Sequence, residues 1–172
     1  MPGIGPYRDN YYQALRASNV YTRVRARLTA NTPATVWDPG SGYKFVLKGF
    51  QLSITCATTT NGAEAAGNML ALVDNNANAP IITLATLMTN TIQAGSHWPG
   101  GWVNATIIAA NTSQQAIGSF IRGDLNEGFK SATAANVLKF ALVDGAATAA
   151  SVNCSAGVFI LNGVVWGNLS TS

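Results

Sequence analysis

The most constraining feature of the sequence is a strict alternation of residue types near its N-terminus. Apolar or small side chains occupy the even positions from 20 to 28, and Tyr21, Arg23, Arg25 and Arg27 occupy the odd positions. Because successive side chains of a β-strand point to opposite faces, this pattern predicts a strand with one buried face and one cationic face.

Short segments rich in β-forming residues continue along the chain. Clusters of Gly, Asn, Pro and Thr separate about eight to ten of them, and no segment keeps the 3.6-residue period of a helix. The longest, residues 43–56, carries Gly49 in its middle, which indicates a bulge or bend. We therefore predict an all-β fold, an antiparallel two-sheet sandwich of jelly-roll type, and exclude architectures in which strands and helices alternate.

The first residues differ in composition from the rest. Residues 1–18 contain two prolines, two glycines and three tyrosines, and we interpret them as an extended N-terminal arm. Residues 19–172 are then expected to form a single β-sandwich domain. Fully extended, the arm would reach about 60 Å, far enough to lie across a neighbouring subunit. Its candidate partner contacts are Tyr7, Arg8, Tyr11 and Tyr12.

The low content of charge predicts association. Charged residues make up 10% of the chain, against about 25% in an average soluble domain. Because a weakly charged surface tends to associate, we expect a homo-oligomer, with a trimer favoured. No apolar run reaches the roughly 18 residues that cross a bilayer, and the N-terminus lacks the pattern of a secretory signal. We therefore expect no membrane partner and synthesis in the cytoplasm.

Groups that could carry catalysis or bind a metal are scarce. The sequence holds one histidine, two cysteines and seven carboxylates, and His97 lacks a second histidine at ligand spacing. The run DNNANAP from Asp74 begins like a calcium-binding EF-hand loop, but Ala79 and Ala85 stand where that loop needs Gly and a bidentate Glu. We predict no enzyme activity, no metal and no cofactor. Mutation of His97 and of Asp124 would test the enzymatic alternative.

The two cysteines, Cys56 and Cys154, fall in β-rich runs. Without a secretory signal they are expected to be reduced and buried in strands. Whether they form a disulfide stays open, since the sequence does not show how close they lie.

Basic residues concentrate at one end of the chain. The first 50 residues hold seven lysines and arginines against two carboxylates, and the remainder holds three against five. Arg23, Arg25 and Arg27 would lie about 7 Å apart along a strand and repel one another. The row has three possible surroundings. It could face solvent and protect a sheet edge, it could face carboxylates of a neighbouring protein, or it could face nucleic-acid phosphates. A row of only three arginines without an aromatic platform argues against nucleic acid.

Two tryptophans flank the residues PGG within GSHWPGGW, a glycine-rich segment from Gly95 that we interpret as a loop. Trp98 and Trp102 are candidate anchors of a protein interface, and a second reading has them stack on sugar rings. Packing of a folded-back loop into the core is the third possibility.

The order of these segments resembles a known class of proteins. Three features follow one another: an N-terminal arm, the segment VWDPGSGYKFVLKGFQLSI from Val36 to Ile54, and LALVD after a flexible stretch of Gly and Ala. In this order they resemble the small β-sandwich structural proteins of tailed bacteriophage virions. Capsid decoration proteins, head-fibre bases and tail proteins belong to this class. The resemblance implies a virion component that binds a capsid or tail lattice as a symmetric oligomer, with no catalytic residues. The alternative function is that of a carbohydrate- or receptor-binding module.

Overall fold

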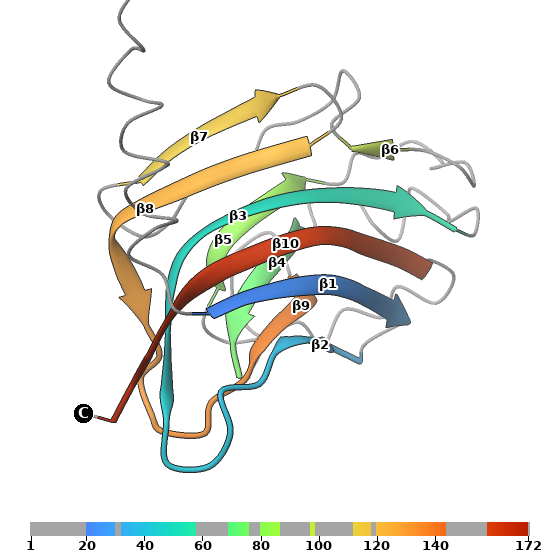
Figure 1. Cartoon of the computed structure of the whole chain (residues 1–172). Helices are drawn as coiled ribbons and strands as arrows, with labels where there is room; N and C mark the ends of the chain where they lie inside the picture. Colours follow the sequence, from blue (N-terminus) through green and yellow to red (C-terminus); the bar gives the residue numbers. More distant parts are fainter. Residues whose placement is uncertain are drawn as a thin grey trace, which may run out of the picture.

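The computed structural model describes residues 20–29, 32–57, 69–75, 80–86, 97–98, 112–117, 120–143 and 158–171. Every regular element in these ranges is a β-strand, and the strands form two antiparallel sheets (Figure 1). The prediction of an all-β fold with two antiparallel sheets is confirmed. The arm predicted over residues 1–18 lies outside the described residues.

The larger sheet has six strands, in the order β1 (Val20–Thr29), β10 (Val158–Ser170), β3 (Lys44–Cys56), β8 (Phe120–Lys130) and β7 (Thr112–Ile117), with β6 (His97–Trp98) also pairing with β3. The smaller sheet has four, in the order β2 (Ala34–Trp37), β9 (Leu138–Val143), β4 (Met69–Asp74) and β5 (Pro80–Thr86). Figure 1 shows β1 and β7 at opposite edges of the larger sheet.

A single large core joins residues of both sheets. Val24, Ala26 and Leu28, the predicted inner face of the first strand, are at most 5% exposed and belong to it. The rings of Trp37 on β2 and Phe45 on β3 meet across the sheets with their centroids 5.8 Å apart. This burial of aromatic and aliphatic side chains is the main force that holds the two sheets together.

The larger sheet bends where glycines replace side chains. The β3–β8 pairing is irregular between Leu47 and Gly49, and the β10–β3 pairing shifts between Trp166 and Gly167. Figure 1 shows β3, β8 and β10 curving strongly along their length. The bulge predicted at Gly49 is therefore confirmed.

One local prediction is wrong. The segment around His97 and Trp98 was expected to be a loop, but these two residues form β6 and pair with Thr55 and Ile54 of β3. Pairing with a long, well-formed strand gives the two residues β structure that their glycine-rich surroundings do not predict.

No helix in the described ranges has the length and apolar character that a membrane crossing requires.

Candidate binding face

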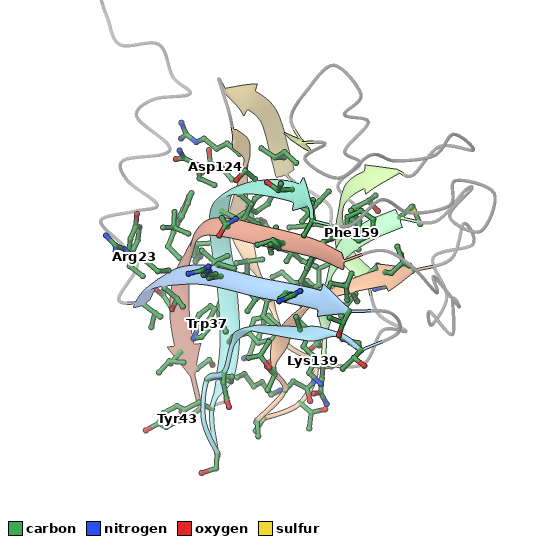
Figure 2. All side chains as sticks on the ribbon, turned by 90° about the vertical axis from the view of Figure 1, so that its right-hand side faces the viewer. Arg23, Trp37, Tyr43, Asp124, Lys139 and Phe159 are labelled. Carbon is green, nitrogen blue, oxygen red and sulfur yellow. The ribbon has the colours of Figure 1, made fainter. Side chains whose placement is uncertain are left out.

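The three arginines of β1 lie on the outer face of the larger sheet. The burial of β1 alternates, so that Arg23, Arg25 and Arg27 are exposed while the residues between them are buried. Figure 2 shows Arg23 pointing away from the body of the molecule. We call Tyr21 and these three arginines the arginine face.

The neighbours of the arginine face on its own sheet carry no charge. In the β1–β10 register, Arg23 lies opposite Val164, Arg25 opposite Asn162 and Arg27 opposite Ile160. None of these neighbours supplies a carboxylate. The ion pair between Arg122 and Asp124 lies on β8, away from the arginine row.

An open hollow adjoins the arginine face. It has a volume of about 450 Å³, and its lining includes Tyr21, Arg23 and Arg25 of β1, Asn162 and Val164 of β10 and Gln51 of β3. Tyr21 is 61% exposed. The lining therefore includes two arginines, two residues with side-chain amides and a tyrosine, a set that suits an anionic group with additional hydrogen-bonding atoms.

The floor of the hollow depends on a glycine. Gly163 has a φ of +141°, and a Cβ added there would lie 2.0 Å from the backbone oxygen of Gln51. Only a residue without a side chain allows β10 and β3 to approach so closely at this point.

A second cluster occupies the outer face of the same sheet, on β8, which β10 and β3 separate from β1. Arg122 Nη2 and Asp124 Oδ2 are 3.2 Å apart, and their side chains are only 17% and 15% exposed. Burial raises the pKa of the Asp124 carboxyl above its ordinary value of 3.8, although the Arg122 guanidinium opposes this shift. Asp124 lies opposite Gly49 in the β3–β8 register.

Trp166 fills the space over Gly49. A Cβ at Gly49 would lie 2.4 Å from Trp166 Cζ2, and the indole is fully buried although Trp166 is not part of the main core. The absence of a side chain at Gly49 therefore makes room for the largest side chain of β10. This packing and the Arg122–Asp124 pair give the outer face a rigid centre beside the exposed arginine face.

The remaining predicted site residues are placed as follows. Tyr7, Arg8, Tyr11, Tyr12 and Trp102 lie outside the described residues, as does Cys154. Trp98 and His97 are placed by their backbone in β6, and Cys56 is the last residue of β3. The disulfide question between Cys56 and Cys154 thus lies outside what the structure describes.

The carboxylate of Asp74 has a local structural role. Its two oxygens accept hydrogen bonds from the backbone N–H of Ala132, at 2.8 Å, and from Asn136 Nδ2, at 2.9 Å. No group of three or more His, Cys, Asp or Glu in the described ranges is arranged to hold a metal ion. Asp74, the first residue of DNNANAP, therefore links β4 to the segment before β9.

Sequence reasoning missed several residues of the hollow. The period placed Tyr21 on the same face as the arginines, but Tyr21 was not among the predicted partner contacts. Gln51 and Asn162 carry no such signal, because only the order of strands in the sheet brings them beside β1.

Comparison of the chain with family models, with curated proteins and with solved structures finds no match.

Proposed function

We propose that this chain is a non-enzymatic structural component of a virion, which binds a capsid or tail lattice as a symmetric oligomer, and that its arginine face is the surface that contacts the lattice. In this proposal the chain is made in the host cytoplasm and ends up in the particle. The observation that carries the proposal is the exposed row Arg23, Arg25 and Arg27, which has no carboxylate opposite it on β10.

The order of the strands supports a viral structural role. The larger sheet contains the order β1-β10-β3-β8 and the smaller sheet has the order β2-β9-β4-β5. We propose that this is a jelly roll, since each of the first three strands is followed by one in the opposite sheet and the last two strands return between earlier ones. Jelly rolls of this size serve as viral capsid domains and as lectins.

The chemistry of the arginine face supports an acidic protein partner. Each opposite-charge pair that forms on a sheet contributes about 0.2–1 kcal/mol, which is weak for one contact. A symmetric oligomer repeats the contact in every subunit, so its binding to a lattice gains from multivalency. A row of modest charge contacts is therefore sufficient for a lattice-binding protein.

Quantitative mass spectrometry of virus particles, purified from cells that carry the gene, tests the proposal. We expect the chain in the particles at a fixed copy number. Particles prepared without the chain should take up the purified wild-type protein and should not take up the triple variant Arg23→Gln, Arg25→Gln, Arg27→Gln. The matched control, Lys44→Gln with Lys139→Gln, removes two charges from other strands and should bind like wild type. Absence of the chain from purified particles, or normal uptake of the triple variant, would overturn the proposal.

The hollow favours a second candidate, an acidic carbohydrate. Arginine suits a sugar carboxylate, the amides of Gln51 and Asn162 suit hydroxyl groups, and Tyr21 offers a ring for stacking. This candidate predicts that Tyr21→Ala and Asn162→Ala abolish binding to uronate- or sialate-containing glycans without changing uptake by particles. No binding to any acidic glycan would exclude it.

A further inference from the structure

We infer that the edge of β1 away from β10, which no described strand covers, accepts an extended acidic segment of another protein as an added strand, with carboxylates at alternate positions opposite Arg23, Arg25 and Arg27. This inference rests on the proposed function, because it names the form in which the lattice partner meets the arginine face.

Among the described strands, β1 pairs on one side only. All ten residues from Val20 to Thr29 pair with β10. On the opposite side, within the described residues, the single further backbone hydrogen bond is from Thr32 N–H to the carbonyl of Thr29, at the last residue of the strand. An edge strand directs the backbone groups of alternate residues away from its sheet, and such groups are the template for strand addition.

The spacing of the arginines matches that of an added strand. Residues i and i+2 of any strand lie about 7 Å apart on one face. An acidic segment with a carboxylate at every second position therefore places one carboxylate opposite each guanidinium group, at the cross-strand distance where opposite charges attract. A neutral or basic segment gains the backbone bonds without the charge pairs, so the arginine row also selects the partner.

A second copy of this chain does not fit the edge. Antiparallel self-pairing centred on Arg25, with both cores on the same side, would place Arg25 opposite its own copy and Arg23 opposite Arg27. Like charges directly opposite one another destabilise a sheet. The row thus guards β1 against self-association, and the same charge leaves it open to an acidic strand.

The chain itself contains no segment of the required pattern. Its seven carboxylates are Asp9, Asp38, Glu64, Asp74, Asp124, Glu127 and Asp144, and no two of them are separated by a single residue. The added strand must therefore come from a different protein.

A synthetic peptide tests the inference on the full chain. The probe is a capped peptide of alternating residues, Thr-Glu-Thr-Glu-Thr-Glu-Thr, titrated into isotopically labelled protein and followed by NMR. We expect binding, with slowed hydrogen exchange for amides of β1. A peptide of the same composition with its glutamates in one block, Thr-Thr-Glu-Glu-Glu-Thr-Thr, should bind more weakly, by up to about fivefold, because at most two of its three charges can face the row.

Backbone methylation separates strand addition from simple charge attraction. One form of the alternating peptide carries N-methyl groups on all glutamates and another carries them on the inner threonines. A strand on a free edge uses the N–H groups of only one of these sets, so one form should lose binding and the other should keep it. Equal affinities of the two forms, whether both kept or both lost, would overturn the inference.

Protein variants complete the test. The triple glutamine variant should lose at least about tenfold in affinity for the alternating peptide, and the Lys44→Gln, Lys139→Gln control should not. Arg25→Glu should weaken binding, and a peptide with lysine in place of the central glutamate should restore it. The triple variant could lose particle uptake while the two methylated peptides bind with equal affinity. That combination would reject strand addition and leave the proposed function intact. Normal uptake of the triple variant would reject the proposed function itself.

Discussion

Gly163 combines a positive φ with a backbone atom that would clash with any added side chain. Its φ of +141° disfavours any side chain, and a Cβ would also lie 2.0 Å from the carbonyl oxygen of Gln51. Gly40 offers a matched comparison, because its φ of +82° is also left-handed but nothing lies within 4 Å of an added Cβ.

We predict that Gly163→Ala lowers the free energy of unfolding by more than about 3 kcal/mol, since it adds a backbone clash to conformational strain. Gly40→Ala should cost only about 1 kcal/mol. Chemical denaturation of both variants measures the difference. Equal losses would mean that β10 moves away from β3 at little cost.

Asp124 predicts a pH dependence of stability. Burial raises the pKa of its carboxyl in the folded protein, so between the ordinary value of 3.8 and the raised value the folded state binds the proton more tightly than the unfolded state does. The contribution of Asp124 to stability is therefore present at low pH and is lost as pH rises through the raised pKa.

The variant Asp124→Asn has no proton to lose in that window. We predict that the melting temperature of the variant, relative to wild type, increases as pH is raised from about 4 to about 7. Thermal unfolding followed by circular dichroism at several pH values measures this difference. A relative melting temperature that falls over the same range would show that the ion pair with Arg122 outweighs the burial of the carboxyl.

Individual residues were predictable where the pattern was local. The two faces of β1 follow from its alternation, and the structure places Arg23, Arg25 and Arg27 outside as expected. The packing of Trp166 over Gly49 was not predictable, since these residues are far apart in the sequence and meet only through the β10–β3 register.

At the scale of elements, Asp74 ties the end of β4 to the segment that leads from β8 into β9. The carboxylate is 5% exposed and accepts hydrogen bonds from Ala132 and Asn136. Since β8 belongs to the larger sheet and β9 to the smaller one, this carboxylate fixes the crossing between the two.

We predict that Asp74→Ala lowers the free energy of unfolding by about 2–4 kcal/mol, because two part-buried hydrogen bonds lose their charged acceptor. Asn136→Ala, which removes one of the two bonds, should cost less. Asp38→Ala is the control, since Asp38 accepts one exposed bond from Gly40 at a surface turn. Urea denaturation of the three variants should rank them in that order, and an Asp74→Ala protein as stable as the Asp38→Ala protein would contradict this role.

Elements rich in β-forming residues were found from the sequence, and elements without them were not. The strand β3 falls within the predicted segment 43–56. The strand β8 contains Asp124, Glu127 and Gly128, which are poor strand formers, and it pairs with both β3 and β7. Tertiary pairing, which local propensity does not report, accounts for that strand and for β6.

At the scale of the whole molecule, the oligomer is the property that remains to be measured. We predict that the full chain forms a trimer, with three times the 17.9 kDa mass of one chain, because so weakly charged a protein gains by covering its surface. The triple glutamine variant should form the same trimer, since the arginine face is assigned to a different protein. Mass photometry of both proteins gives the answer, and a monomer at all concentrations would contradict it.

The two-sheet, all-β architecture followed from the sequence, but the order of strands did not. Period and composition show where strands lie and which faces are buried. They do not show that β10 inserts between β1 and β3, which is what brings Asn162 and Gln51 beside the arginines. The hollow was therefore beyond sequence reasoning, whereas the arginine row was not.

The position of β10 has a consequence for biosynthesis. Ribosomes add about 5–20 residues per second, so β1 leaves the ribosome on the order of ten seconds before the strand that pairs with it. Throughout that interval the nascent β1 has both edges open, next to other nascent chains on the same messenger. Three positive charges in so short a segment oppose strand pairing between neighbouring nascent chains. The arginine row that we assign to partner binding therefore also protects the nascent chain from aggregation.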